Sequence, residues 1–422
     1  MSTIHSFKAI RPNPPLAAEI SCPPYDVIST AEARSLAEGL PHSYLHVIRP
    51  EIDVAPDVDP HAPEVYEQGR AAIERLLAEG HLIEDDQPSM FAYRLVWRGR
   101  RQLGLVCTVD AAEYRDGRIR RHEKTRPDKE DDRTQHLLVS SVHAEGVFLA
   151  FRDEVDGADE IRAVLVEATS DRPLVHFVRD DVTHTLWKIR DPERFVTLFA
   201  RVPELYIADG HHRSAAGERA ATERAAGNPQ HDGREEYNRI LAAIFPEGEL
   251  EILPYHRIVK DLHGLDAAGF LARLAEVGTV TPLDAGVAPD PGHGEVAVFV
   301  DGGWHTLAFP PDSIPQDDPI ACLDVALLQD RVLTPILGIG DPRTDPRIDF
   351  VGGVRGTGDL ERRVASGEVA AAFAMHATSM AELLRVADAG EIMPPKSTWF
   401  EPKLRSGLFA HRFETARETA TS

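Results

Sequence analysis

A strand-to-helix junction stands at the centre of this sequence, at Leu205-Tyr206-Ile207-Ala208-Asp209-Gly210-His211-His212-Arg213-Ser214. Its first four residues are apolar or aromatic and predict a short buried strand, and Asp209-Gly210 predicts a turn. The segment 214–226 is rich in Ala, Glu and Arg and contains no proline, which predicts a helix. Two histidines and an arginine therefore stand where a strand passes into a helix.

This junction has the chemistry of an anion site. The start of a helix offers backbone N–H groups without intrahelical acceptors and the positive end of the helix dipole. Gly210 permits close approach of the backbone to a ligand, and the planar guanidinium of Arg213 suits phosphate. Together these features predict a site of the kind that holds phosphates.

The junction has two other interpretations, of which the first stays open and the second is weaker. Asp209 can serve as a plain N-cap, with His211 and His212 as a solvated pair. A zinc site is disfavoured, because adjacent histidines in a turn rarely point at one metal. In addition, no cysteine or second histidine pair stands at ligand spacing nearby.

Composition limits the class of protein. The chain has 422 residues, enough for two or three domains, and 42% of them are hydrophobic. It carries 69 acidic and 46 basic residues, a formal net charge of −23, which disfavours nucleic acid as a partner. Three cysteines far apart, Cys22, Cys107 and Cys322, suit a reducing cytosol without a disulfide framework.

The order of expected elements is mixed and not a regular strand–helix repeat, which predicts an α+β fold. The pattern of residues changes near residue 260, which predicts two regions, 1–260 and 261–422. Asp110 to Arg121 is expected to form a hairpin turning at Asp116-Gly117. No window approaches 18 consecutive apolar residues and the start has no signal-peptide run, so a cytoplasmic protein without a membrane span is expected.

A second group of polar residues is His122-Glu123-Lys124-Thr125-Arg126, just before Pro127, which can open a helix. A carboxylate among cations stays ionised and suits a base that orients a hydroxyl. Lys124 and Arg126 can balance phosphate charge, and Thr125 can cap the helix or touch a ligand. Arg133 lies on the same helix. The alternative is a charged, solvated loop before an exposed helix.

Common nucleotide-binding signatures do not occur. The sequence has no Gly-x-x-x-x-Gly-Lys-Ser/Thr stretch, no Gly-x-Gly-x-x-Gly after a strand, and no protein-kinase catalytic loop. If the chain handles nucleotides, it uses a less common type of site.

Several stretches together resemble a known family. The chain is similar to the bacterial domain-of-unknown-function 1015 family, related to the ParB/sulfiredoxin-like fold. The matching stretches run in the expected order over nearly the whole chain: Pro23-Pro24-Tyr25-Asp26-Val27-Ile28, Arg121-His122-Glu123-Lys124-Thr125, Tyr206 to Arg213, Leu253-Pro254-Tyr255-His256-Arg257, Leu323-Asp324-Val325-Ala326-Leu327-Leu328, and Met393-Pro394-Pro395-Lys396-Ser397-Thr398-Trp399-Phe400.

The resemblance implies a ParB/sulfiredoxin-like nucleotide-binding catalytic region over 1–260, with large insertions and an additional C-terminal region. It also implies a kinase that transfers a phosphoryl group from ATP or ADP to the hydroxyl of free L-serine, giving O-phosphoserine. Gly210, His211, His212 and Arg213 match the turn that holds the phosphates. Glu123 matches the glutamate that activates the serine hydroxyl.

The implied chemistry adds further expectations. Asp209 is expected to hold Mg²⁺ or the serine hydroxyl, and Mg²⁺ is expected because phosphate charge calls for a hard cation with oxygen ligands. Lys124, Thr125, Arg126 and Arg133 are candidate substrate or phosphate contacts. Two rival functions remain: a nucleotide-binding switch without turnover, and a phosphate-ester hydrolase using the same site. The sequence leaves the oligomeric state and the role of 261–422 open.

Overall fold

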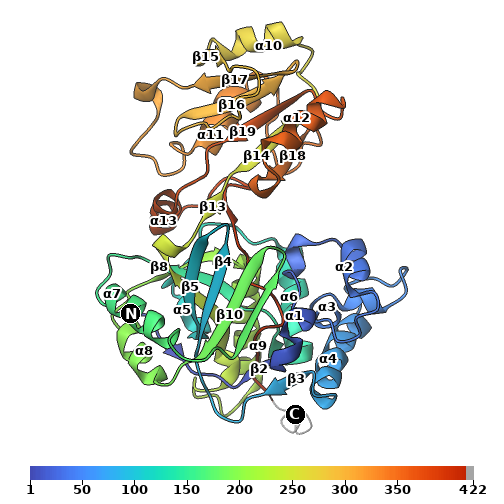
Figure 1. Ribbon diagram of the computed structural model, residues 1–422, viewed down its shortest axis with the longest axis vertical. Coiled ribbons are helices and arrows are strands. Elements are labelled where there is room, and N and C mark those ends of the chain that lie inside the picture. Colours follow the sequence, from blue (N-terminus) through green and yellow to red (C-terminus); the bar gives the residue numbers. More distant parts are fainter. Residues whose placement is uncertain (415–422) are drawn as a thin grey trace. The chain divides into compact units, whose positions relative to one another are not determined.

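The computed structural model describes residues 1–414, which form two compact units (Figure 1). The first unit contains Met1–Leu250 and the described residues from Pro402 on, and the second contains Glu251–Glu401. The sequence predicts a boundary near residue 260, with all of 261–422 in the second region. The second unit starts earlier because Tyr255–Val259 (β14) already pairs with two strands of the second sheet.

The first unit is built on a nine-stranded mixed sheet. Its strands are β1 Ile4–His5, β4 Phe91–Trp97, β5 Arg100–Asp110, β6 Ile119–Arg120, β8 Val147–Phe151, β9 Val175–Arg179, β10 Val182–Lys188, β11 Leu205–Asp209 and β12 Arg239–Pro246. The order is β6-β11-β8-β12-β5-β4-β10-β9, and β1 pairs with β5. All five residues of β8 are buried, as expected for a central strand covered on both faces.

Helices cover this sheet. The helices α7 (Ala158–Ala168) and α8 (Pro192–Phe199) share a core cluster with the sheet, through residues such as Phe195, Leu149 and Ile207. The helix α9 (His211–Gly227) packs through Ala216 and Ala220 against α6 (Pro127–Ser140). A Cβ at Gly217 of α9 would lie 2.9 Å from Ile240 Cγ1, so this small residue lets the helix approach β12 closely.

Residues 110–121 differ from the predicted hairpin. They form the short helix α5 (Ala111–Arg115) followed by β6. The residues of α5 are mostly good helix formers, and Gly117 adopts φ 77° after the helix as a C-terminal stop. Because β6 then pairs parallel with β11, the segments that follow these two strands leave the sheet at the same end of the strands.

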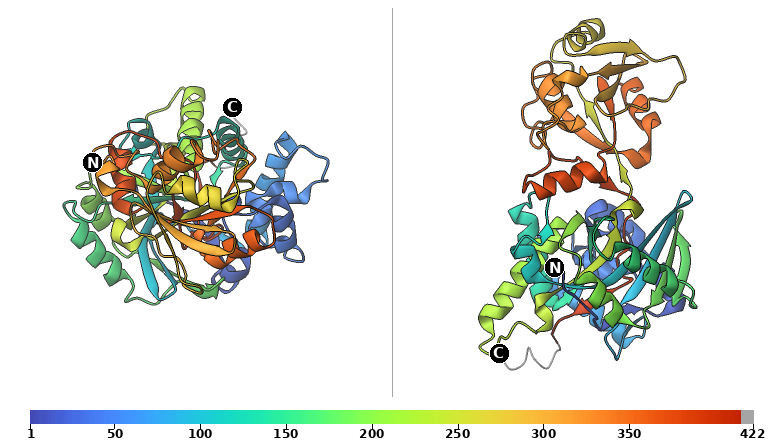
Figure 2. Two further views of the ribbon diagram at one scale, coloured as in Figure 1. Left: turned by 90° about the horizontal axis from the view of Figure 1, so that it is seen from above. Right: turned by 90° about the vertical axis from the view of Figure 1, so that its left-hand side faces the viewer.

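A smaller sheet and four helices complete the first unit. The strands β2 (Ala9–Pro12), β3 (Leu82–Glu84), β7 (Val142–His143) and β21 (Ala410–Arg412) are ordered β3-β2-β21-β7. The helices are α1 Ala17–Ile20, α2 Thr30–Ala37, α3 Leu45–Ile48 and α4 Pro63–Ala78. The red end of the chain thus lies beside the blue β2 of its beginning (Figures 1 and 2).

The second unit has its own antiparallel sheet. Its strands are β14, β15 Thr279–Pro282, β16 Glu295–Val300, β17 Gly303–Ala308, β18 Ile348–Gly352 and β19 Ala371–Met375, in the order β15-β17-β16-β19-β14-β18. The helices are α10 Ala267–Leu274, α11 Asp324–Leu328, α12 Thr357–Ala365 and α13 Met380–Asp388. A separate ribbon joins β13 (Ile252–Leu253) to β20 (Trp399–Phe400) at its entry and exit.

Both units mix helices with sheets, and the predicted α+β class is confirmed. None of the helices within residues 1–414 combines the length and the apolar composition needed to cross a membrane. All three cysteines are buried and free.

Candidate functional site

The predicted strand, turn and helix are present at the junction. The strand β11 ends at Asp209, Gly210 adopts φ 95°, and α9 begins at His211. The helix starts earlier than expected, so His211, His212 and Arg213 form its first turn. The first intrahelical bond runs from Ser214 N–H to Gly210 O at 2.9 Å. The N–H groups of residues 211–213 therefore have no acceptor within the helix.

The side chain of Arg213 folds back over Gly210. Its Nη2 donates to Asp209 Oδ2 at 2.9 Å, and its Nη1 donates to the carbonyl of Gly146. A Cβ on residue 210 would lie 3.0 Å from both Cζ and Nε of Arg213, so a side chain there would crowd the guanidinium in addition to straining the backbone at φ 95°. The buried Nε has no hydrogen-bond partner within residues 1–414. A cation at a helix start with a spare donor is suited to an anionic ligand.

Asp209 lies between two cations. Besides Arg213, Lys403 approaches it, with Nζ 3.4 Å from Asp209 Oδ1. Burial opposes ionisation of this carboxyl, but Lys403 and Arg213 hold the pKa of Asp209 below its ordinary value. Asp209 is therefore ionised at neutral pH and held by its partners, which makes it an orienting group more than a base.

The two histidines of the junction are kept neutral. Burial lowers the pKa of both, well below the ordinary value for His211, where the neighbouring His122, His212 and Arg213 add to the effect. His211 Nε2 lies 3.5 Å from the backbone N–H of His122 as an acceptor, and His212 Nε2 accepts from the N–H of Arg126 at 3.0 Å. Both neutral rings therefore carry their proton on Nδ1, and both hold the loop that contains Glu123.

Glu123 is brought to the junction by strand pairing. In the parallel pair of β6 with β11, Ile119 lies opposite Leu205, so the segment after β6 emerges beside the turn after β11. Glu123 Oε2 lies 3.5 Å from His211 Nδ1, and the Glu123 side chain is 59% exposed. The two polar groups that are far apart in the sequence thus lie together, with the Glu123 side chain largely exposed to solvent.

The neighbours of Glu123 have separate roles. Thr125 Oγ1 donates to Glu130 Oε2 at 3.0 Å at the start of α6. The guanidinium of Arg126 donates to both carboxylate oxygens of Asp128, at 3.1 and 2.8 Å, and its side chain is 70% exposed. Lys124 is exposed. Of these residues, Arg126 reaches the junction through its backbone N–H, which donates to His212 Nε2.

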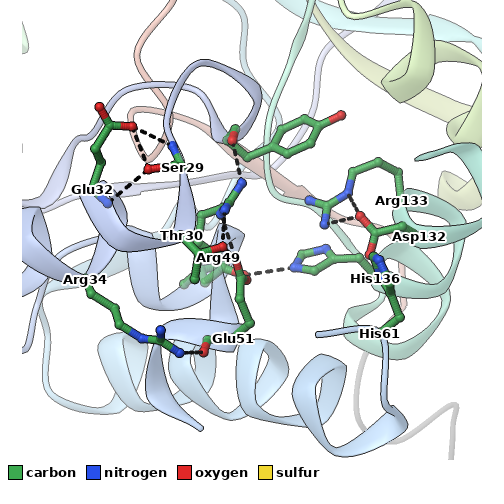
Figure 3. Close-up of polar contacts among 12 residues, drawn as sticks. Ser29, Thr30, Glu32, Arg34, Arg49, Glu51, His61, Asp132, Arg133 and His136 are labelled. Atoms are coloured by element: carbon green, nitrogen blue, oxygen red, sulfur yellow. Dashed lines mark hydrogen bonds and ion pairs between the residues drawn. The ribbon is translucent and has the colours of Figure 1, made fainter. Parts of the chain in front are cut away.

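Arg133 is bound within the protein (Figure 3). Its Nε and Nη2 donate to Asp132 Oδ2 at 2.9 and 2.7 Å, and its Cζ lies 4.3 Å from the ring centroid of Tyr25. His61 and Tyr66 also bond Asp132, each at 3.0 Å. Arg133 therefore supports the segment that contains Tyr25, whose carbonyl accepts from Arg49 at 2.8 Å.

Three residues near the junction were not anticipated. Glu145 accepts from Tyr25 N–H at 3.3 Å and from Ser406 Oγ at 2.5 Å, and burial raises its pKa although Arg213 opposes this. Asp26 is exposed and acts electrostatically on Arg213. Lys403 comes from the last part of the chain. Pro23–Ile28 was noted as a stretch, but no local pattern indicated that Lys403 returns to Asp209.

The donor set fits a metal only in part. Within residues 1–414, no group of three or more His, Cys, Asp or Glu side chains is arranged to hold a metal ion. Mg²⁺ is commonly held by one or two carboxylates together with substrate phosphates and water. Asp209 and Glu123 are the carboxylates at the junction that fit such a partial set.

Several proteins of known structure are similar to this chain. Similar solved structures include a free serine kinase variant, one glutamate replaced by glutamine, in complex with AMP: 13% identity, 70% of this chain and 87% of that chain covered, TM-score 0.35. A second free serine kinase variant, with a glutamate replaced by alanine and in complex with ADP, has 14% identity, 70% of this chain and 87% of that chain covered, and a TM-score of 0.34. C-terminally truncated SbnI from Staphylococcus aureus has 10% identity, 71% of this chain and 85% of that chain covered, and a TM-score of 0.36.

No curated protein matches the chain significantly. A family model described as a protein of unknown function (DUF1015) matches residues 4–326, which include the junction, the Glu123 loop and most of the first unit. The chain belongs to the DUF1015 family.

Proposed function

We propose that the protein is a small-molecule kinase that transfers a phosphoryl group from ATP or ADP to the hydroxyl of free L-serine. One observation carries the proposal: the buried Arg213 Nε has no partner within the described chain and lies over Gly210 at the start of α9. A phosphate group supplies the missing acceptor there. The nearby Glu123 carboxylate supplies a base beside that phosphate.

The phosphates are held by the helix start. The N–H groups of residues 211–213 point to the same end of α9, and Arg213 adds charge and a planar donor. Asp209 fixes the Arg213 guanidinium through the 2.9 Å bond. Mg²⁺ bound with the nucleotide would neutralise phosphate charge, and Asp209 would be its candidate protein ligand at the junction.

The transfer step needs positioning and one proton acceptor. The serine Oγ forms a bond to the terminal phosphorus as the bond from that phosphorus to the bridging oxygen breaks, and ADP or AMP leaves. Glu123 takes the hydroxyl proton. His211 orients Glu123 through its Nδ1–H, 3.5 Å away, and the proton of the neutral ring stays on Nδ1 because Nε2 accepts from the backbone N–H of His122. His212 fixes the same loop through Arg126.

The experiment is a product assay with the purified protein, Mg²⁺, ATP or ADP, and L-serine beside other small alcohols and amino acids, read by mass spectrometry. O-phosphoserine formed only with the protein is the expected result, and it identifies the donor. A different phosphorylated acceptor would keep the mechanism and change the substrate. Bound nucleotide without product would favour the switch, and free phosphate alone would favour the hydrolase.

A further inference from the structure

We propose that Lys403, supplied by the segment 402–409 after the second unit, is a phosphate-binding residue of the site at Gly210. The inference rests on the proposed function and extends it to a residue that no motif of the junction contains. Lys403 Nζ lies 3.4 Å from Asp209 Oδ1, on the carboxylate oxygen that Arg213 does not use. Asp209 thus holds one cation on each of its two oxygens.

The charges around Asp209 favour an anion. The Asp209 carboxylate is paired with both a guanidinium and an ammonium beside the positive end of α9, and Glu145 and Asp26 also act electrostatically on Arg213. The unpartnered Nε of Arg213 marks the same place as lacking an acceptor. A terminal phosphate between Arg213 and Lys403 would accept charge-assisted hydrogen bonds from both cations.

The segment that carries Lys403 is firmly placed in the first unit. Cys22 and Ser406 exchange two backbone hydrogen bonds, at 3.1 and 3.0 Å. Arg405 donates to Ser21 O at 2.7 Å and to Asp180 Oδ2 at 2.6 Å. Ser406 Oγ donates to Glu145. These bonds fix residues immediately after Lys403, so its ammonium is positioned before any ligand arrives.

The placement of this segment is also set by backbone geometry. Gly407 adopts φ 83°, and a Cβ there would lie 2.6 Å from Tyr44 Cγ. The chain is thereby held against the buried Tyr44, whose hydroxyl donates to Ala144 O at 3.0 Å. Only a glycine permits this close approach. The backbone of the segment 402–409 is therefore fixed by packing next to the site.

The test is calorimetric titration of the full-length protein with ADP and with inorganic pyrophosphate. The variants are Lys403→Met, which removes the charge, and Lys403→Arg, which keeps it. Lys8→Met, at an exposed lysine of the first unit, is the control. Lys403→Met should weaken both ligands at least tenfold, Lys403→Arg by only a few fold, and Lys8→Met not at all. Unchanged binding by Lys403→Met would overturn the proposal.

A second measurement covers the case in which Lys403→Met unfolds. The wild-type protein is treated with acetic anhydride with and without pyrophosphate, and labelled lysines are identified by mass spectrometry. Pyrophosphate should slow labelling of Lys403 and leave Lys8 unchanged; equal labelling of Lys403 in both conditions would overturn the role. Protected binding without production of O-phosphoserine would contradict the serine kinase activity but would still support the role of Lys403 in phosphate binding. Wild-type protein that binds neither ligand would overturn both.

Discussion

At the scale of single residues, the two carboxylates of the junction lie in different environments. Arg213 and Lys403 hold Asp209 ionised between them, so that carboxylate is occupied with two cations. Glu123 instead faces solvent, with a neutral histidine behind it. The difference in environment, and not in residue type, makes Glu123 the better candidate of the two for the general base of the proposed reaction.

Replacing Glu123 by glutamine tests this assignment. Glu123→Gln keeps the size of the side chain and removes the proton acceptor, so the turnover rate should fall by about 10²- to 10⁴-fold, the usual contribution of a general base. The affinity for ADP should change little, because Glu123 does not belong to the helix start. Glu38→Gln, at an exposed residue of the first unit, is the matched control. Full activity in Glu123→Gln would show that another group takes the proton.

Replacing Arg213 by lysine tests the phosphate cradle. A lysine keeps the charge but cannot bond Asp209 and Gly146 together while offering Nε–H to a ligand. ADP binding should weaken by about 10- to 100-fold, the equivalent of one charge-assisted hydrogen bond. The control is Arg219→Lys on the same helix, whose side chain pairs with Asp131 and Glu223. Equal loss in both variants, measured by titration calorimetry, would argue for a general effect on α9.

Buried histidines predict acid sensitivity. Burial lowers the pKa of His122, His136 and His411 to about 4, and of His143 and His184 to about 3. Between these values and the unfolded value near 6.5, the unfolded chain binds more protons than the folded chain. The free energy of unfolding should therefore fall as pH falls from about 6.5 towards 4, by up to about 1.4 kcal/mol per pH unit for each histidine.

Urea titrations at pH 7, 6 and 5 measure this slope. The variant His122→Gln removes one buried imidazole, and its stability should depend on pH less steeply by the equivalent of one proton. The absolute stability of the variant does not matter for this comparison, because only the slope is read. A stability that stays constant from pH 7 to pH 5 would contradict the neutral state inferred for these side chains.

At the scale of elements, the junction depends on where α9 begins. The helix starts directly after Gly210, so three consecutive residues present N–H groups and Arg213 returns over the glycine. The parallel pairing of β6 with β11 then places the Glu123 loop at the same edge of the sheet. Neither element makes the site by itself, because one supplies the N–H donors and the other supplies the Glu123 carboxylate.

Gly210→Ala is the corresponding prediction for the element. A Cβ at φ 95° strains the backbone by about 1–2 kcal/mol and meets the Arg213 guanidinium at 3.0 Å. The variant should lose that stability and also bind ADP more weakly, because Arg213 must move. Gly227→Ala, at the other end of α9, meets no atom within 4 Å and is the control, expected to be neutral or slightly stabilising. Thermal unfolding and ADP titration of both variants provide the comparison.

At the scale of the whole molecule, the second unit is an insertion within the first. The chain leaves the first unit after Leu250 and re-enters it at Pro402. The entering and leaving segments pair as β13 and β20, with Leu253 opposite Trp399. Such a ribbon can be closed by a two-residue turn, since an antiparallel pair of this kind is the frame of a hairpin.

A shortened chain tests this organisation. Replacing residues 254–398 by Asn-Gly should leave a folded first unit that binds ADP within a few fold of the full chain. A chain that ends at residue 250 lacks Lys403 and β21, and it should bind ADP at least tenfold more weakly or fail to fold. Titration calorimetry and circular dichroism measure both properties. Loss of binding in the closed chain, with its fold intact, would assign the second unit a direct part in nucleotide binding.

The sequence alone determined the features that depend on neighbouring residues. The apolar run before Asp209, the glycine at 210 and the alanine-rich segment after it specify a strand, a turn and a helix through local propensity. The same reasoning was wrong at 110–121, where the helix-forming residues of α5 prevail over the hairpin suggested by Asp116-Gly117. Chain composition and element order were enough for the α+β class.

Only the tertiary structure decided which distant groups meet. The approach of Glu123 to His211 follows from the pairing of β6 with β11, which no residue of either segment encodes by itself. The approach of Lys403 to Asp209 follows from the return of the chain after an inserted unit. Burial, which keeps His211 neutral, is likewise a property of everything packed around the ring. Local patterns carry secondary structure, whereas proximity and desolvation belong to the folded chain.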